Sequence, residues 1–250
     1  MISEDSFLRR IPLAYETLGR MELEAIAFSI DAIYLNHQRI SQWAARCEPK
    51  SFLKTPYRER LELFLYLWSI VDQADALRRL LRKIRTNESV LEFRKISDAA
   101  QSMRNSMDHL SQNIPNIANK KGHVPPVYGA FSFGRFHFDE AGVEIEDFEI
   151  YTITAGSLTH KAHKWPVPNP LGKILDIPVG MFEFSAFDRT LDVSALVRCL
   201  SGIVHLFDTR VRNRIETAIR SAAEEKGLDA EPMLSEYAGS IATVIEGKIK

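Results

Sequence analysis

An arginine, an asparagine and a histidine lie close together near the middle of the chain, at Arg104, Asn105 and His109. Histidine titrates near neutral pH, so it can take a proton from a ribose 2′-hydroxyl or give one to a leaving oxygen. Arginine can hold a phosphate and offset the charge that grows on it in the transition state. An asparagine amide can orient the histidine or donate to a phosphate oxygen. Together these residue types suit metal-independent cleavage of an RNA phosphodiester.

Helical periodicity places the three residues outside the core. Apolar residues recur at intervals of three and four from about residue 87 to 114, which predicts one helix with a buried stripe through Met103 and Met107. At about 100° per residue, Arg104 lies roughly 80° from the centre of this stripe, and Asn105 and His109 lie on the opposite side. One helix supplies a single histidine. Two copies facing each other across a homodimer would supply an acid–base pair.

The alternative for these residues is a solvated helix face with an Arg104–Asp108 ion pair and a bystander histidine. Spacing alone does not decide between the two, because the chain contains a second arginine–histidine pair on a predicted helix, Arg198 and His205. Arg198 is followed by Cys199 rather than by a polar amide. Asn105 and the position within the helix therefore distinguish the first pair from the second.

Four further helices are predicted, at about residues 21–46, 55–85 and 193–226 and from about residue 231. Residues 1–20 are expected to form a short helical or irregular lead-in that ends at Gly19. His37 shares the apolar stripe of the first helix and is interpreted as a core or interface histidine. Thr55 and Pro56 are expected to start the next helix, and Asp192 or Ser194 to cap the one that ends at Gly227.

The helix at 55–85 has two apolar faces in its first half, so it is central in a bundle or covered by a partner subunit. Asp72, Asp75 and Arg79 continue the Trp68 face in polar form. These residues mark a pocket edge or, as we favour, a solvated face with an Asp75–Arg79 ion pair. The end of this helix is basic, which complements the helix dipole or grips RNA phosphates. The RNA-binding candidates are Arg78, Arg82, Lys83 and Arg85.

Residues 115–192 differ from the rest, since they hold most of the prolines and many aromatics. Alternating patterns predict strands at 131–138, with a bulge at Gly134, and at 143–145, 149–154 and 181–184. His160 and His163 have metal-ligand spacing but no third ligand nearby, so no metal or cofactor is expected. The prediction is an α+β chain, mainly α: a helical bundle at 1–114 and 193–250 with a small antiparallel β insert at 115–192, between the third and fourth helices.

The composition is that of an ordinary globular protein. The 250 residues are 45% apolar and carry a net charge of −1, which disfavours wrapping of long nucleic acids but allows a grip on a few phosphates. Two distant cysteines, Cys47 and Cys199, fit a reducing cytoplasm and build no disulfide framework. The first residues lack a signal-peptide apolar run, and no apolar stretch approaches the length of a membrane span. A cytoplasmic protein without membrane contact is expected.

Arg104-Asn105-(three residues)-His109, near the end of a third helix, resembles the motif of HEPN-domain proteins. The resemblance covers the helices at 21–114 and 193–226. It implies Arg104, Asn105 and His109 as catalytic residues, with Asp72 on the preceding helix as a weaker addition. It also implies a metal-independent endoribonuclease with its site at a symmetric dimer interface, of the kind found among toxins and phage-defence effectors. The β insert is larger than in the compact form of that family.

Two other functions stay open. The chain can be a non-catalytic protein that uses the bundle and the β insert to hold a protein partner. It can also be a nucleotide-binding accessory subunit of a nucleotidyltransferase, a role that occurs in the family the motif resembles. The expected partners are therefore an RNA substrate and a second copy of the chain, with an antitoxin or a nucleotidyltransferase as further candidates.

Overall fold

The computed structural model describes residues 1–11, 15–47, 54–84, 86–119, 127–138, 144–155, 182–232 and 234, with the backbone alone at 135–138 and 144–150. The described chain is mainly helical, with one four-stranded antiparallel sheet inserted between α6 and α7. The predicted α+β class is confirmed. The chain forms two compact units, residues 28–202 together with Met1, and residues 2–27 together with 203–250.

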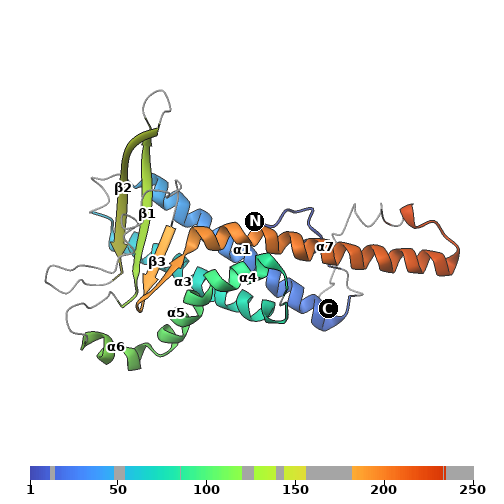
Figure 1. The fold of residues 1–250 in the computed structure, drawn as a ribbon, viewed down its shortest axis with the longest axis horizontal. Coiled ribbons are helices and arrows are strands. Elements are labelled where there is room, and N and C mark those ends of the chain that lie inside the picture. Colours follow the sequence, from blue (N-terminus) through green and yellow to red (C-terminus); the bar gives the residue numbers. More distant parts are fainter. Residues whose placement is uncertain are drawn as a thin grey trace, which may run out of the picture. The chain divides into compact units, whose positions relative to one another are not determined.

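The first unit is built on two long helices and the sheet (Figure 1). The helices are α1 (Thr17–Arg46), which also contributes to the second unit, and α3 (Tyr57–Leu80), followed by the short turn η2 (Leu81–Lys83). The side chain of Asn36 donates to the Ser69 hydroxyl at 3.0 Å and joins α1 to α3. Two predicted boundaries are wrong. Gly19 lies inside α1, and α3 begins at Tyr57 after Pro56, which provides no side-chain cap.

Both apolar faces of α3 are buried. One consists of Leu63, Leu67, Ile70, Ala74, Leu77 and Leu81. The other packs on the sheet, where the rings of Phe64 and Trp68 lie 6.0 and 5.3 Å from the ring of Phe184. The sequence indicated that this second apolar face would be covered by other helices of a bundle or by a partner subunit. In the structure the sheet covers it.

The single helix predicted over 87–114 is three helices. They are α4 (Glu88–Ile96), α5 (Asp98–Asp108) and α6 (Leu110–Ala118). The first break is at Ser97, which is fully buried and whose amide donates to the Phe93 carbonyl at 2.8 Å. The second break is at His109. Pro115, which was expected to end the helix, lies inside α6.

The sheet has the strand order β2-β1-β3-β4, and Figure 1 shows β1 between β2 and β3. The strands are β1 (Ala130–Phe138), β2 (Glu144–Thr154), β3 (Phe182–Ala186) and β4 (Arg189–Asp192). Two details of the prediction are wrong. Gly134 pairs regularly with Ile150, and the register shifts instead between Phe136 and Phe138. The two strands predicted over 143–154 are one strand, β2, and β4 was not predicted.

One face of the sheet is aromatic and contacts α1. Phe131 and Phe133 on β1 stack at 5.6 Å, and the ring of Trp43 from α1 meets both, at 6.5 and 5.9 Å. His37, also on α1, packs 5.4 Å from the Phe182 ring. Burial lowers the pKa of His37, which fits the core histidine that its place on the apolar stripe indicated.

The other face of the sheet carries a polar row across all four strands. The strand register places Thr152, Ser132, Glu183 and Asp192 side by side. The hydroxyls of Ser132 and Thr152 lie 2.9 Å apart. Glu183 therefore stands between a hydroxyl and a carboxylate, and its buried Oε2 atom has no hydrogen-bond partner among the described residues.

The position of Glu183 makes stability depend on pH. Burial, and to a lesser extent the Asp192 carboxylate, raise the pKa of Glu183 from 4.5 to about 7. The folded protein then holds this proton more tightly than the unfolded chain, so stability falls as pH rises from about 4.5 to about 7. After allowance for solvent screening, the loss is about 1.5 kcal/mol. Glu183→Gln should be more stable than wild type at pH 8 and equal to it at pH 4.5. Urea denaturation across this range measures the difference, and parallel profiles would contradict it.

The β3–β4 hairpin leads directly into α7 (Val193–Lys226). Its two turn residues, Phe187 and Asp188, have φ of 50° and 59°, as a two-residue type I′ turn requires. The Phe187 ring lies 6.1 Å from the Trp68 ring, a contact that offsets the strain of a bulky residue in this conformation. Asp192 caps α7 by accepting from the Ala195 amide at 2.7 Å, whereas Ser194 accepts from the Phe182 amide.

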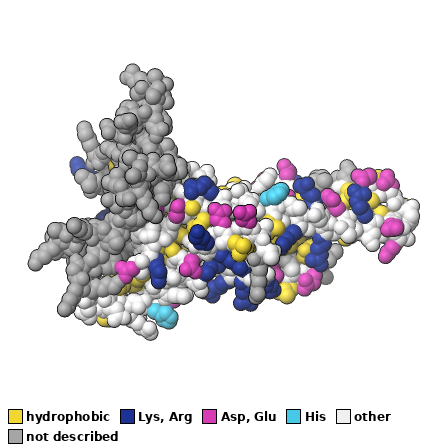
Figure 2. All heavy atoms as spheres, in the orientation of Figure 1, with side chains coloured by type: hydrophobic (Ala, Val, Ile, Leu, Met, Phe, Trp, Pro, Cys, Tyr) yellow, Lys and Arg dark blue, Asp and Glu magenta, His cyan; other side chains and the backbone are white. Residues whose placement is uncertain are grey.

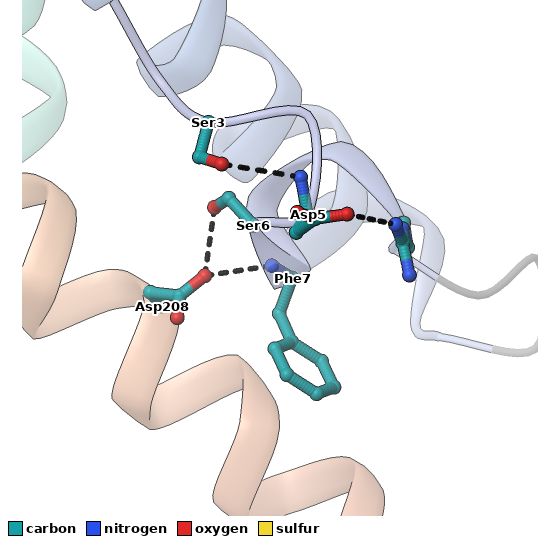
Figure 3. Close-up of polar contacts among 6 residues, drawn as sticks. Ser3, Asp5, Ser6, Phe7 and Asp208 are labelled. Atoms are coloured by element: carbon teal, nitrogen blue, oxygen red, sulfur yellow. Dashed lines mark hydrogen bonds and ion pairs between the residues drawn. The ribbon is translucent and has the colours of Figure 1, made fainter. Parts of the chain in front are cut away.

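In the second unit, Asp208 of α7 holds the N-terminal segment (Figure 3). Its Oδ1 atom accepts from the Ser6 hydroxyl at 2.7 Å and from the Phe7 amide at 2.6 Å. These bonds anchor the short turn η1 (Phe7–Arg9). The last predicted helix, from Glu231, falls largely outside the described residues. No helix in the described ranges has the length and apolar character needed to cross a membrane.

Candidate active site

Arg104 and Asn105 lie on α5, but His109 lies at the joint between α5 and α6. The His109 amide donates to the Asn105 carbonyl at 3.3 Å, and its own carbonyl accepts from the amides of Gln112 and Asn113, each at 3.0 Å. His109 is thus the last bonded residue of one helix and the cap of the next. Its side chain and that of Asn105 are exposed, as the helical wheel indicated.

Local sequence explains the break at His109. The residues around it are mostly Asn, Ser, Asp and His, whose helix propensity is low because their short polar side chains compete for backbone groups. Asn113 donates its side-chain amide to the Ser106 carbonyl at 2.9 Å. The Ser106 hydroxyl bonds back to the Ser102 carbonyl at 2.9 Å. These bonds take over backbone groups at the end of α5 and stabilise the break.

The Arg104 guanidinium is surrounded by three carboxylates. Its Nε atom lies 3.9 Å from Asp72 and 3.8 Å from Asp108, and its Nη1 atom lies 3.8 Å from Asp75. All three distances exceed hydrogen-bond length, so Arg104 gains electrostatic attraction without directed bonds. The Arg104–Asp108 pair of the solvated-face alternative is therefore present, and Asp72 does lie beside Arg104.

Asp75 also belongs to this cluster, although no catalytic or positioning role was expected for it from the sequence. Its Oδ2 atom lies 2.8 Å from Nη2 of Arg79, which is the expected helical ion pair, but the solvated face on which that pair was expected is wrong for Asp75, whose side chain is 0% exposed. Neither oxygen has a well-aligned hydrogen bond among the described residues. A signal was available, because Asp75 continues the buried Phe64–Val71 stripe of α3 at helical spacing.

The neighbouring carboxylates also affect Asp72. Burial is the largest influence and raises the pKa of Asp72, the carboxylates of Asp108 and Asp75 raise it further, and the Arg104 guanidinium opposes them. The net shift is upward. The cluster thus holds more negative than positive charge around Arg104, and a proton on Asp72 would reduce the excess.

The predicted RNA-binding residues have different surroundings. Arg78 is bound across to α5, where it donates to Gln101 and to Asp98, the latter at 2.8 Å. Arg82 and Lys83, in η2, are exposed. Arg85 lies outside the described residues. In the face shown in Figure 2, Lys and Arg side chains gather over part of the surface with Asp and Glu side chains close by, so the field there is mixed.

Metal ligands do not gather in the described ranges. No group of three His, Cys, Asp or Glu side chains there has a suitable arrangement. His160 and His163 lie outside these ranges. Cys47 and Cys199 are buried thiols, and burial, with the Glu92 carboxylate, raises the pKa of Cys199 to about 12. Such a thiol is a poor nucleophile near neutral pH.

The structure brings together one predicted pair of site side chains, Arg104 and Asp72, and leaves Asn105 and His109 open to solvent one helical turn apart. Asp75 and Arg79 complete the cluster on the α3 side. No family model matches this chain, and no curated protein or solved structure is significantly similar to it.

Proposed function

We propose that this protein is a metal-independent endoribonuclease of HEPN type that acts as a homodimer. Arg104, Asn105 and His109 of both subunits would form the composite site, and the RNA would be gripped through Arg82 and Lys83. The observation that carries the proposal is His109, exposed at the α5–α6 joint about one helical turn from Asn105 and five residues from Arg104. We place the protein in the cytoplasm, as a toxin or phage-defence effector that an antitoxin partner could restrain.

The proposed reaction needs two histidines. His109 of one subunit takes the proton of a ribose 2′-hydroxyl, and that oxygen attacks the adjacent phosphorus. The partner's His109 gives a proton to the departing 5′-oxygen, which leaves a 2′,3′-cyclic phosphate and a 5′-hydroxyl. Arg104 offsets the charge on the phosphate oxygens. Its long distances to Asp72 and Asp108 support this role, because its N–H donors are not committed to either carboxylate.

Purified protein should cut single-stranded RNA in EDTA and leave cyclic phosphate ends. His109→Ala should lower the cleavage rate at least about a hundredfold, because it removes both the general base and the general acid. His205→Ala is a matched control, since His205 is an exposed histidine of α7. Gel analysis of labelled RNA measures the rates. Equal cleavage by wild type and the Arg104→Ala/His109→Ala double variant would sink the assignment, as would a monomer in sedimentation at active concentrations.

A second function is favoured by the carboxylates around Arg104. The ion pairs with Asp72 and Asp75, both on α3, can have the sole role of holding α5 against α3, and the pair with Asp108 lies within α5. The chain would then be a non-catalytic protein whose bundle and sheet hold a partner protein. It would show no cleavage under any condition, and it would bind its partner equally well after His109→Ala.

A further inference from the structure

A cavity of about 600 Å³ lies between the end of α1 and the start of α3, within the first unit. This volume falls in the range of small-molecule sites. The residues that line it belong to Arg39–Cys47 and Lys54–Tyr66, and none of them is a residue of the candidate active site. The cavity is therefore a separate feature that the proposed cleavage does not use.

Three cationic side chains line the cavity, Arg39, Arg46 and Lys54. Arg39 and Arg46 are seven residues apart on α1 and so share one face of the helix. No carboxylate in the described part of the chain lies within ion-pair distance of any of the three. Surface arginines and lysines are commonly paired along a helix, as Arg58 and Glu62 are here at 3.1 Å. Within the described residues, this group of three cations around a cavity is a positive site without a paired carboxylate.

The acidic residues of the cavity do not cancel this charge. Glu59 and Glu62 also line it. Glu62 is bound to Arg58, an arginine that is not part of the lining. Glu59, the other acidic residue of the lining, has no cationic partner among the described residues. In the described part of the lining, three cations thus face one carboxylate that has no cationic partner there.

Arg39 is held in place before any ligand binds. Its Nη1 atom donates to the Tyr66 hydroxyl at 3.3 Å, and its guanidinium carbon lies 5.4 Å from the centre of the Tyr66 ring. The neighbouring wall is Trp43, whose ring is fixed by its contacts with Phe131 and Phe133. A guanidinium fixed on an aromatic face loses little freedom when it binds an anion.

We propose that this cavity binds a small phosphate-bearing anion the size of a nucleoside diphosphate. Arg39, Arg46 and Lys54 hold its phosphate groups, and the Tyr66 side chain borders the remainder. Guanidinium groups match phosphate oxygens in geometry, and a multiply charged group satisfies several cations at once. This inference goes beyond RNA cleavage and does not rest on it.

Calorimetric titration of the full chain with pyrophosphate and with ADP tests the proposal at low salt. Saturable binding of one equivalent is expected for both. Lys54→Ala and Arg46→Ala should each weaken it about tenfold, because each removes one charge from the cavity. Glu59→Gln should tighten binding, because it removes the free carboxylate. Weaker binding after Lys54→Ala or Arg46→Ala and tighter binding after Glu59→Gln cannot both result from a general loss of folding.

Arg198→Ala is the matched control, since Arg198 is an exposed arginine of the same unit that does not line the cavity. It should leave both affinities unchanged. No saturable binding of pyrophosphate or ADP at millimolar concentration would overturn the proposal. Equal weakening by Arg198→Ala would overturn it too, because binding would then follow net charge. If the protein bound an RNA oligonucleotide but neither pyrophosphate nor ADP, that result would also overturn the proposal.

Discussion

Gly129→Ala is expected to lower the free energy of unfolding by about 4 kcal/mol, measured by urea denaturation. Gly129 precedes β1 with φ of 99°, a conformation that an L side chain rarely adopts. A Cβ atom there would lie 2.6 Å from the Phe184 ring and 2.7 Å from the Ser185 carbonyl oxygen. The backbone cannot move aside easily, because Trp68 donates to the Tyr128 carbonyl at 3.1 Å and Ala155 to the Gly129 carbonyl at 3.1 Å.

Gly227→Ala separates the two causes of this loss. Gly227 also has a positive φ, 62°, but no atom lies within 4 Å of the position its Cβ would take. This variant should lose only about 1 kcal/mol, the cost of the backbone conformation. The difference between the two variants measures the clash with β3. Equal losses would show that backbone strain alone, and not the contact with Phe184, requires glycine before β1.

Arg104→Ala is expected to destabilise the protein by about 2.5 kcal/mol, apart from any effect on RNA cleavage. The substitution leaves Asp75 fully buried with Arg79 as its remaining cation. A buried carboxylate that loses part of its compensating charge is costly, since it has no access to water. His109→Ala should leave stability within about 0.5 kcal/mol of wild type, because His109 is exposed. His109→Ala is therefore the cleaner test of catalysis.

A double-mutant cycle identifies Asp75 as the cause. In an Asp75→Asn background the buried charge is absent, so Arg104→Ala should cost less than about 1 kcal/mol. Urea denaturation of the four proteins gives the coupling energy. An unchanged cost in the Asp75→Asn background would mean that Arg104 stabilises the fold by packing alone, and that Asp75 is stabilised by Arg79 without its help.

The buried face of each long helix could be predicted from the sequence, because apolar residues spaced by three and four lie on one side of a helix. The stripes of α1, α3 and α7 are buried as expected, with residues such as Ile30, Ile70 and Leu200 at 0% exposure. The helix breaks were not predictable in this way. The apolar repeat continues through Ser97 and His109. The bonds at the breaks are made by polar side chains, with the Ser97 hydroxyl donating to the Arg94 carbonyl at the first break and Ser106 and Asn113 donating to backbone carbonyls at the second. Periodicity reports which face is buried but not whether the axis bends.

The sheet was predicted where alternation was strong and missed where it was weak. Residues 131–133 and 182–184 alternate clearly, and both lie in strands. Arg189-Thr190-Leu191-Asp192 offers one apolar residue, and its pairing depends on the turn at Phe187 and Asp188. Asp is common at the left-handed positions of such a turn, but a bulky residue such as Phe187 disfavours them. Contact with Trp68, distant in sequence, is what permits the turn.

The polar cluster of the site was only partly predictable. Arg104 and Asp72 were named on motif and helix position, and Asp75 with Arg79 as a helical pair. That all four meet depends on how α5 packs against α3, which the sequence of either helix does not determine. The burial of Asp75 matters most, because the positive charge of Arg104 then compensates a buried carboxylate. Arg104 therefore has a structural role in addition to its proposed chemical one.

The α5–α6 joint gives His109 an unusual mechanical position. Two helices meet at this one residue, so rotation about its backbone swings α6 as a lever about 13 Å long. A rotation of about 20° would move the far end of α6 by roughly 4 to 5 Å while the imidazole, at the fulcrum, stays almost in place. Such a rotation would change the surface beside His109 without displacing the residue on which cleavage would depend.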